Sequence, residues 1–470
     1  MAEYLVAGGR PLHGCLTIQG AKNAALPLLA AALLPPESRI ARCPRLRDTE
    51  AAAAILRSLG CRVRREGDSV LVDARPAGGW EISEGWMREM RSSIIFLGAI
   101  LTRFGRARVS YPGGCELGPR PIDLHLMALR RLGAVIREDH GTLECTVPGG
   151  RLSGAEVVLP FPSVGATQNT LIAAALAAGR TVLRGGAREP EIDDLAAFLN
   201  AAGARIRRES GGEFVIDGVE ALHPVEHRVI PDRIAAVTYL CCCAAAGGEI
   251  ELWDCLPDQF AAALPCLEAA GCRLRRYPDA LRLTAPERLS AMGWIKTLPY
   301  PGFPTDAQAP VMAVAAIGSG TTVFTETIFE SRFRHAAELA RMGADIRTEG
   351  RVAIVTGVPA LHGAPVVSTD LRGGAALVVA ALAAAGESRI GGSSHIERGY
   401  EELDHCLQAL GADITRSEPY EKEEKDRARP AEGDAAEKKA PPPGPQPALL
   451  PDVHRHRGGG GADPLADGVL

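Results

Sequence analysis

The sequence predicts an α/β (α+β) protein that is built from six repeats of about 70 residues and followed by a disordered C-terminal tail. The first observation is a phrase such as Leu-Gly-Ala or Ala-Gly-Cys that recurs six times. Its glycines are Gly60, Gly133, Gly203, Gly271, Gly343 and Gly411. Their separations are 73, 70, 68, 72 and 68 residues. This period indicates one structural unit used six times, and it exceeds the ~20–50 residues of a solenoid repeat.

The second observation is the change of pattern at each glycine. A helical pattern ends there and an alternating pattern begins, as in the stretch from Arg347 to Ile354. A helix often ends with a residue at positive φ, which glycine adopts without strain. Helix and strand therefore alternate, and each unit is predicted to be a small α/β module.

The third observation is that each unit holds one helix that is apolar nearly all round, as buried helices are. These helices are predicted at residues 23–34, 92–101, 166–178, 234–246, 308–317 and 374–385. The other helix of each unit is amphipathic, as at 194–202 and 336–342, and is expected to face solvent. We therefore expect sheets outside and helices inside, with three units in each of two similar domains.

Composition sets the broad class of the protein. Apolar residues make up 46% of the 470 residues and the net charge is −5, so a globular protein without nucleic-acid partners is expected. The N-terminus lacks the pattern of a signal peptide, and apolar runs such as Ala24–Leu34 are shorter than the ~20 residues of a membrane span. Twelve cysteines without a zinc-like spacing indicate reduced thiols, no metal site and a cytoplasmic protein.

The starts of the apolar helices carry the main functional signal. They read Lys22-Asn23, Arg91-Ser92, Ser163-Val164-Gly165, Asp232-Arg233, Thr305-Asp306 and Asp370-Leu371-Arg372. Helix N-termini present free N–H groups and the positive end of the helix dipole. Ordinary capping explains Ser163, Thr305 and Asp370. It does not explain Lys22 or Arg91, because a cation there is unfavourable without an anion, so an anion site is predicted.

The loops before the amphipathic helices add polar chemistry. The loop from Tyr111 to Pro121 is rich in glycine and proline and contains Cys115, either a chance surface thiol or a functional one. Single arginines recur at loop and helix ends. They are Arg120, Arg332, Arg372 and Arg398. Each is either simply solvated or part of one cleft, where guanidinium groups suit phosphate and carboxylate.

Taken together, these phrases resemble the UDP-N-acetylglucosamine 1-carboxyvinyltransferase family of enolpyruvyl transferases. The motifs are Gly20-Ala21-Lys22-Asn23-Ala24-Ala25, Pro112-Gly113-Gly114-Cys115, Arg120-Pro121-Ile122-Asp123-Leu124-His125, Ser163-Val164-Gly165-Ala166-Thr167, Ala187-Arg188-Glu189-Pro190-Glu191-Ile192, Pro304-Thr305-Asp306, Glu326-Thr327-Ile328-Phe329-Glu330 and Arg398-Gly399-Tyr400. The resemblance covers residues 4–416. It implies a two-domain inside-out α/β barrel that closes around its substrates. Residues 1–21 and 231–416 would form one domain and residues 22–230 the other, with crossings near Ala21-Lys22 and Ile230-Pro231.

The resemblance implies transfer of enolpyruvate from phosphoenolpyruvate to the 3′-hydroxyl of UDP-N-acetylglucosamine, the first step of peptidoglycan synthesis. Lys22, Arg120 and Arg398 would hold the phosphate, and Arg332 and Arg372 the carboxylate. Cys115 would be the proton donor and the target of fosfomycin, and Asp306 the base. The remaining residues assigned to substrate binding are Asn23, Arg91, Pro121, Ile122, Asp123, Leu124, Ser163, Val164, Gly165, Ile328 and Asp370. No metal or organic cofactor is implied.

Some features depart from the family pattern. Ala235 stands where the family usually has an acidic residue, and Ile95 where it often has a tryptophan. Residues 417–470 have too little apolar periodicity to fold, and no partner of this tail is predicted. One alternative is 3-phosphoshikimate 1-carboxyvinyltransferase, which the Cys115 loop and Asn23 disfavour. The other is a catalytically silent paralogue that binds a UDP-sugar and regulates, which only Ala235 supports.

Overall fold

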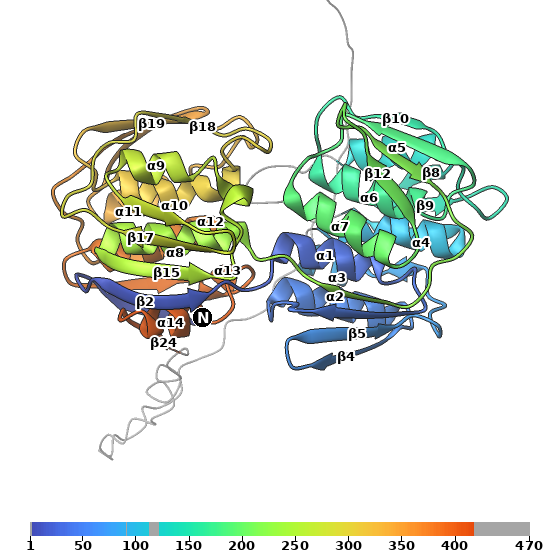
Figure 1. The fold of residues 1–470 in the computed structure, drawn as a ribbon, viewed down its shortest axis with the longest axis horizontal. Coiled ribbons are helices and arrows are strands. Elements are labelled where there is room, and N and C mark those ends of the chain that lie inside the picture. Colours follow the sequence, from blue (N-terminus) through green and yellow to red (C-terminus); the bar gives the residue numbers. More distant parts are fainter. Residues whose placement is uncertain (1, 91, 112–121, 418–470) are drawn as a thin grey trace, which may run out of the picture. The chain divides into compact units, whose positions relative to one another are not determined.

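Two hydrophobic cores organise the protein. The computed structural model describes residues 2–90, 92–111 and 122–417, and Figure 1 shows their course. One core draws its side chains from residues between Ala21 and Val229. The other combines Tyr4 to Ile18 with residues between Ala235 and Ile414. Each core is built from three α/β units, as the repeats predict.

Each unit contributes one sheet, and every sheet has four strands. Around the first core the sheets are β14 (Val225–Arg228), β3 (Glu37–Ala41), β5 (Ser69–Asp73) and β4 (Arg62–Glu66); β6 (Glu81–Ile82), β7 (Arg106–Ser110), β9 (Thr142–Thr146) and β8 (Val135–Asp139); and β10 (Glu156–Val158), β11 (Arg180–Arg184), β13 (Phe214–Asp217) and β12 (Arg205–Arg208). Around the second core they are β2 (Leu12–Thr17), β15 (Gly248–Trp253), β17 (Ala280–Thr284) and β16 (Arg273–Arg276); β18 (Trp294–Lys296), β19 (Thr321–Thr325), β21 (Val352–Thr356) and β20 (Asp345–Glu349); and β22 (Pro365–Val367), β23 (Glu387–Gly391), β1 (Glu3–Ala7) and β24 (Asp413–Ser417). In each sheet, in the order given, the first two strands are parallel and the other pairs antiparallel.

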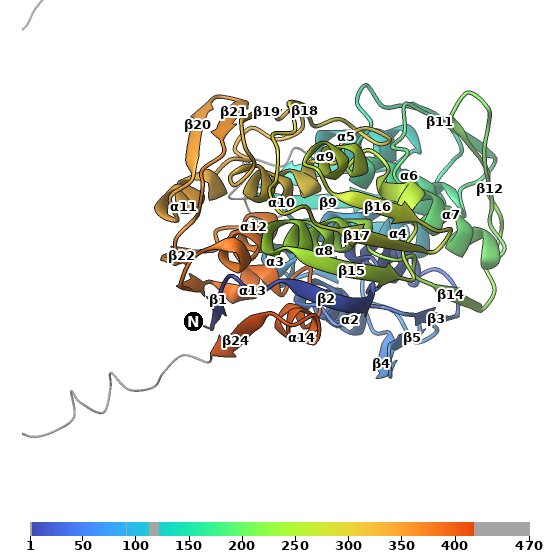
Figure 2. The same ribbon diagram turned by 60° about the vertical axis from the view of Figure 1, so that its left-hand side comes forward.

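The apolar helices lie where the sequence predicts them. They are α1 (Lys22–Ala31), α4 (Phe96–Phe104), α6 (Val164–Ala174), α8 (Arg233–Ala246), α10 (Thr305–Ala315) and α12 (Leu371–Ala383). In the second core α8, α10 and α12 pack against one another, and in the first core α4 packs against both α1 and α6. Figures 1 and 2 show the sheets outside these helices, with β2, β15 and β17 covering α8. The fold class predicted from the repeats is therefore confirmed.

The other described helices differ in length and in burial. They are α2 (Arg47–Ser58), α3 (Glu84–Glu89), α5 (Asp123–Arg131), α7 (Pro190–Ala201), α9 (Leu264–Ala269), α11 (His335–Arg341), α13 (Ser393–Ile396) and α14 (Leu403–Ala409), with 3-10 turns at Ser93–Ile95 and Pro257–Phe260. The expectation that the amphipathic helices face solvent is only partly correct for α7. Most of its residues are buried, because it packs against α1 and α6 as well as against its own sheet.

The repeated glycines have the conformation that the pattern predicts. Gly60, Gly133, Gly203, Gly271, Gly343 and Gly411 have φ between 94° and 101°. Each directly follows the last turn of its helix, where L-residues with side chains are rarely found.

The two halves of the chain exchange one strand. Strand β2 precedes α1 but pairs with β15, whereas β14 precedes α8 but pairs with β3. The segments that connect them run side by side, because Ala21 N donates to Ile230 O at 2.8 Å and Asp232 N to Gln19 O at 2.9 Å. This antiparallel contact lies directly before the starts of α1 and α8.

The C-terminal boundary differs slightly from the sequence prediction. Ser417, assigned above to the tail, is the last residue of β24 and pairs with Glu3 of β1. The pairing was not visible in the sequence because its partner strand lies at the other end of the chain. Residues 418–470 lie outside the described residues. In the part of the chain that the structure describes, every helix is too short or too polar to cross a membrane.

Candidate functional site

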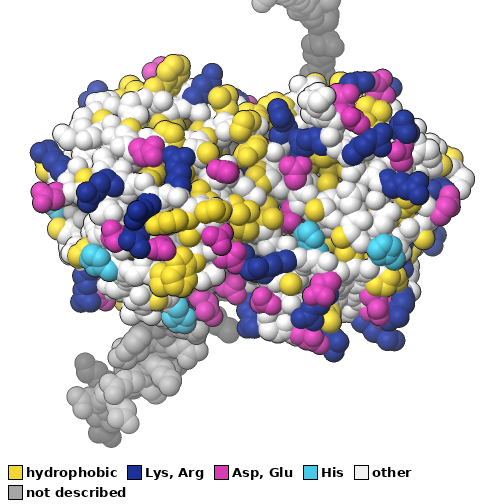
Figure 3. Space-filling model, in the orientation of Figure 1, with side chains coloured by type: hydrophobic (Ala, Val, Ile, Leu, Met, Phe, Trp, Pro, Cys, Tyr) yellow, Lys and Arg dark blue, Asp and Glu magenta, His cyan; other side chains and the backbone are white. Residues whose placement is uncertain are grey.

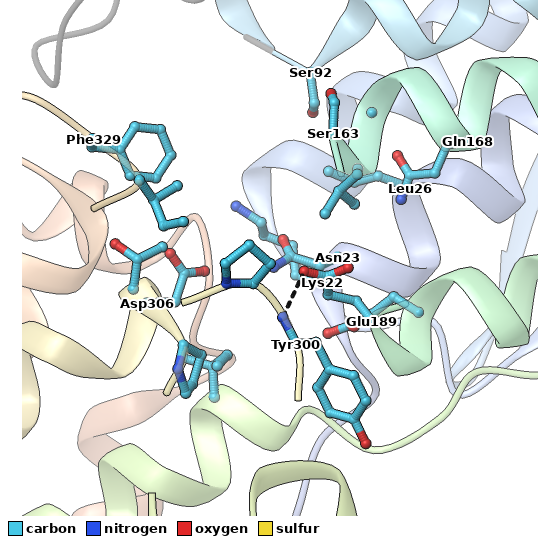
Figure 4. A pocket seen from close by; sticks show the side chains of 18 of the residues that line it. Lys22, Asn23, Leu26, Ser92, Ser163, Gln168, Glu189, Tyr300, Asp306 and Phe329 are labelled. Atoms are coloured by element: carbon cyan, nitrogen blue, oxygen red, sulfur yellow. Dashed lines mark hydrogen bonds between the residues drawn. The ribbon is translucent and has the colours of Figure 1, made fainter. Parts of the chain in front are cut away.

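A cavity of about 500 Å³ lies at the starts of the apolar helices. Figure 4 shows Asp306 and Phe329 on one side of it, Ser92, Ser163 and Gln168 on another, and Lys22 and Asn23 between them. All the predicted site residues that the structure describes line this cavity: Lys22, Asn23, Ile122, Asp123, Leu124, Ser163, Val164, Gly165, Asp306, Ile328, Arg332, Asp370, Arg372 and Arg398. Cys115, Arg91, Arg120 and Pro121, which were also predicted, lie outside the described residues.

Capping accounts for two of the three helix starts assigned to it. Ser163 Oγ accepts from Ala166 N at 3.3 Å, and Asp370 Oδ1 accepts from Arg372 N and Gly373 N at 3.0 Å each. The expectation for Thr305 is wrong. Pro304 occupies the N-cap position of α10, and the Thr305 hydroxyl donates instead to Glu326 Oε2 at 2.9 Å. Thr305 therefore holds the loop after β19 against the start of α10.

Lys22 has a partner within the chain. Its Nζ lies 3.2 Å from Asp48 Oδ2, and Arg398 Nε donates to Asp48 Oδ1 at 2.8 Å. Burial and the nearby cations Arg372 and Arg398 lower the pKa of Lys22, while Asp48 opposes this. Burial alone would raise the pKa of Asp48, but Lys22 and Arg398 together hold it below its usual range. Contrary to the expectation from the sequence, Lys22 therefore does not require an external anion, because the buried carboxylate of Asp48 already compensates its charge.

Asp306 is held between two arginines. Its Oδ1 lies 3.0 Å from Arg332 Nη2 and its Oδ2 lies 3.3 Å from Arg372 Nη2. Enclosure in the cavity would raise the pKa of Asp306, but Arg372, Arg332 and Lys22 outweigh it and hold the pKa well below its usual range. The side chain is 29% exposed and faces the cavity. Asp306 is thus ionised at neutral pH in the cavity as described, and a ligand can reach it.

The two arginines have further buried donors that lack a partner among the described residues. Their side chains are only 4% and 2% exposed, yet Arg332 Nε and both Nε and Nη1 of Arg372 have no hydrogen-bond partner among the described residues. The Arg372 guanidinium lies over the Tyr400 ring at 5.3 Å, which fixes its plane. Buried donors without partners are rare in folded proteins. The two guanidinium groups are suited to a small anion with a carboxylate or phosphate group.

On the side of the cavity away from Asp306 (Figure 4), the lining residues belong to the first core and come from the starts of α5 and α6. His125 packs on Gly165, where an added Cβ would lie 2.7 Å from the ring, so position 165 requires glycine. Asn169 Oδ1 accepts from Gly98 N at 2.9 Å, which orients the Asn169 amide so that Nδ2 donates to His125 Nδ1 at 2.8 Å. The proton of His125 is therefore on Nε2, beside the start of α6.

Several cavity residues were missed by the sequence analysis. They are Asp48, His125, Glu189, Glu191, Arg233 and Tyr300. His125 and the two glutamates stand inside quoted motifs, so proximity to assigned residues was an available signal. Asp48 and Tyr300 gave none, because an acidic residue in a first helical turn and a tyrosine in a loop are ordinary features. The described residues contain no group of histidine, cysteine and carboxylate side chains suited to a metal ion.

Comparison with known proteins identifies the class to which this fold and site belong. The sequence profile of the family described as EPSP synthase (3-phosphoshikimate 1-carboxyvinyltransferase) matches residues 6–407. The chain belongs to this family of enolpyruvyl transferases. Among its relatives is UDP-N-acetylglucosamine 1-carboxyvinyltransferase 1 of Symbiobacterium thermophilum, 51% identical over 88% of this chain and 95% of the relative. UDP-N-acetylglucosamine 1-carboxyvinyltransferase 2 of Caldanaerobacter subterraneus is 47% identical over 88% of this chain and all of the relative.

Solved structures agree with the fold. The enolpyruvyl transferase NikO from Streptomyces tendae matches with a TM-score of 0.80 and 26% identity, over 88% of this chain and 99% of that one. An EPSP synthase from Acinetobacter baumannii matches with a TM-score of 0.68 and 18% identity, over 89% of this chain and all of that one. The second similarity, at its low identity, concerns the fold alone.

Proposed function

We propose that this chain transfers enolpyruvate from phosphoenolpyruvate to the 3′-hydroxyl of UDP-N-acetylglucosamine and releases phosphate. Its relatives at 44–51% identity carry the name of that activity, which favours it over the 3-phosphoshikimate enzyme. The observation that carries the proposal is the pair of buried arginines with unpaired donors beside an ionised Asp306. A substrate with a carboxylate and a phosphate would use these donors, and the hydroxyl that attacks it needs a base.

The roles follow from the contacts. Arg332 and Arg372 would bind the carboxylate of phosphoenolpyruvate, and Lys22 and Arg398 its phosphate. Asp306, fixed between the two arginines, would accept the proton of the sugar hydroxyl as its oxygen bonds to the enol carbon. The proton for the methylene carbon is assigned to Cys115, and Arg120 is assigned to the phosphate, both from the family resemblance.

The nucleotide would lie along the first-core wall. Ile122, Asp123 and Leu124 at the start of α5 and the Ser163–Gly165 turn would hold it, with Ile328 nearby. Arg91 and Pro121 are assigned to the nucleotide from the family resemblance alone. The N-terminus of α6 offers free N–H groups for a diphosphate. Asn23 and Asp370 complete the proposed substrate-binding set.

The wider assignments rest on the same proposal. Residues 1–21 with 231–416 and residues 22–230 would act as two domains that close on the substrates. The reaction would open peptidoglycan synthesis in the cytoplasm, and neither metal nor organic cofactor would take part.

Phosphate release tests the proposed function directly. Purified protein mixed with both substrates should release phosphate, and omission of either substrate should abolish release. Release with 3-phosphoshikimate in place of the nucleotide sugar would favour the other family activity. Binding of the nucleotide sugar without any release of phosphate would support a silent paralogue.

A further inference from the structure

One family motif has no role in the site described so far. Residues 187–192 lead into α7, with Glu189 at its N-cap position and Pro190 as its first residue. The Glu189 side chain accepts no capping hydrogen bond from its own helix. Its carboxyl group is therefore not needed to start α7, yet it lines the cavity.

The next acidic residue of this motif fixes the position of Glu189. Glu191 Oε1 accepts from Arg233 Nε at 2.9 Å and Oε2 from Arg233 Nη2 at 3.3 Å. Both side chains are buried, so this pair ties the start of α7 to the start of α8. Both oxygens of Glu191 are used by this contact, whereas those of Glu189 are not.

Glu189 has unused hydrogen-bonding capacity. Its Oε1 accepts from Tyr300 N at 3.5 Å, the long limit for a hydrogen bond, and Figure 4 shows this contact. Its Oε2 is buried and has no partner among the described residues. Burial raises the pKa of Glu189, the opposite of the shift at Asp306. A buried carboxyl group this poorly satisfied is expected to gain a partner when the cavity fills.

The chemistry of the cavity indicates what that partner is. Phosphate and carboxylate groups are drawn to Lys22, Arg332, Arg372 and Arg398 and repelled by a carboxylate. A carboxyl group with a raised pKa instead suits a neutral donor such as a hydroxyl or amide N–H. Helix α7 packs against α1, which begins with Lys22 and Asn23, so Glu189 lies towards the residues assigned to the reacting end of the substrates.

We propose that Glu189 is a further substrate-contacting residue that hydrogen-bonds a hydroxyl or amide group of the N-acetylglucosamine ring. The inference rests on the proposed function and assigns a sugar contact that distinguishes the nucleotide sugar from its nucleotide alone.

Calorimetric titration with UDP-N-acetylglucosamine and, separately, with UDP tests this. Glu189→Ala should weaken the Kd for the nucleotide sugar about tenfold to a hundredfold, the range for a hydrogen bond to a charged or buried group. The Kd for UDP should stay within about twofold. Glu226→Ala, on the outer strand β14, is the matched control and should change neither.

A second variant, Glu189→Leu, separates loss of the sugar contact from loss of the fold. Glu189→Leu has a similar size, removes the unpaired buried oxygen and should melt at or above the parent temperature, with the same selective loss of sugar affinity. The proposed sugar contact would be overturned by an equal loss of affinity for UDP-N-acetylglucosamine and UDP. It would also be overturned by unchanged affinity for both ligands in either folded variant. A parent protein that binds neither ligand would instead refute the proposed function.

Discussion

Asp306 and Glu189 face the same cavity, but their surroundings have opposite effects. Asp306 stands between Arg332 and Arg372, which keep it ionised. Arg233, the cation that acts on Glu189, is already paired with Glu191, so burial dominates and raises the pKa of Glu189. The cations beside each carboxyl group thus decide which one is ionised at neutral pH, and groups with pKa values shifted apart are typical of acid–base sites.

The strongest test of this comparison is Asp306→Asn. The amide keeps the size of the side chain but cannot accept a proton, so kcat should fall about 10²–10⁴-fold. The KM for phosphoenolpyruvate should not rise, because the two arginines lose their internal anion. Steady-state phosphate release measures both constants. A kcat within twofold of the parent would show that Asp306 is not the base.

Cys115 variants test whether the proton donor is Cys115 or a carboxyl group such as Glu189. Cys115→Ser should lose about 10²-fold or more of turnover, because a hydroxyl is far too weak an acid. Cys115→Asp should keep measurable turnover and become insensitive to fosfomycin. Mass spectrometry should place one fosfomycin adduct per parent chain at Cys115. An adduct on another cysteine, or full turnover of the serine variant, would require another donor.

The arginine side of the comparison is tested by Arg372→Lys. A lysine keeps the charge but cannot make the bidentate hydrogen bonds of a guanidinium group or stack on Tyr400. The KM for phosphoenolpyruvate should therefore rise about tenfold to a hundredfold. Arg275→Lys, on the exposed edge strand β16, is the control and should change nothing. An unchanged KM in Arg372→Lys would mean that charge alone holds the substrate.

The dependence of protein stability on pH should differ between Asp48, a buried carboxyl group with ion-pair partners, and Glu189, a buried carboxyl group without one among the described residues. Asp48 has a lowered pKa, so its contribution is present above its unfolded value of ~3.9 and is lost as the pH falls through the folded value. Asp48→Asn should therefore cost about 3 kcal/mol at pH 7 and less in acid. Glu189 has a raised pKa, so its ionised form costs stability at pH 7 and that cost disappears as the pH falls towards ~4.3.

Glu189→Gln should accordingly raise the free energy of unfolding by about 1 kcal/mol at pH 7, with no gain near pH 4. Thermal melts of both variants between about pH 2 and pH 8 would show the two opposite trends, with that of Asp48→Asn confined to pH values below about 4. Parallel pH profiles for the two variants would contradict the comparison.

The smallest effect is expected at the C-terminus. Truncation after Ser417 keeps the pairing of β24 with β1, so Tm and turnover should match those of the full chain. A melting curve and a turnover assay suffice. A clear loss in either would show that residues 418–470 contribute to the folded core or to the cavity.

The sequence was sufficient for the parts of the fold that repeat. All-round apolar helices and glycines at positive φ are local patterns, so the apolar helices and the six units could be predicted. These helices are α1, α4, α6, α8, α10 and α12. The family motifs then placed the cavity residues. Asp48 could not be predicted as the partner of Lys22, because that contact joins the starts of two different helices and depends on their packing. Thr305 was wrongly expected to cap α10. Its neighbour Pro304 occupies the N-cap position, and a proline side chain cannot form the hydrogen bond by which a cap is normally recognised in a sequence.

Pairings between distant segments were the other limit. Nothing in the local pattern of β2 distinguishes a strand that pairs with β3 from one that pairs with β15, because both partners offer a similar edge. The family resemblance located the crossings near Ala21 and Ile230, but the exchange itself is a property of the packed units.

The pairing of β1 has a consequence for synthesis of the protein. Glu3 lies opposite Ser417 and Gly391, so β1 finds its neighbours only after nearly all of the chain from β1 to β24 has been made. Residues 22–230 can collapse around their own core earlier, while β1 and β2 wait as unpaired edges. Long-range pairing of this kind is slow and leaves strand edges open to other chains. The N-terminal strands are therefore where a chaperone would be needed longest.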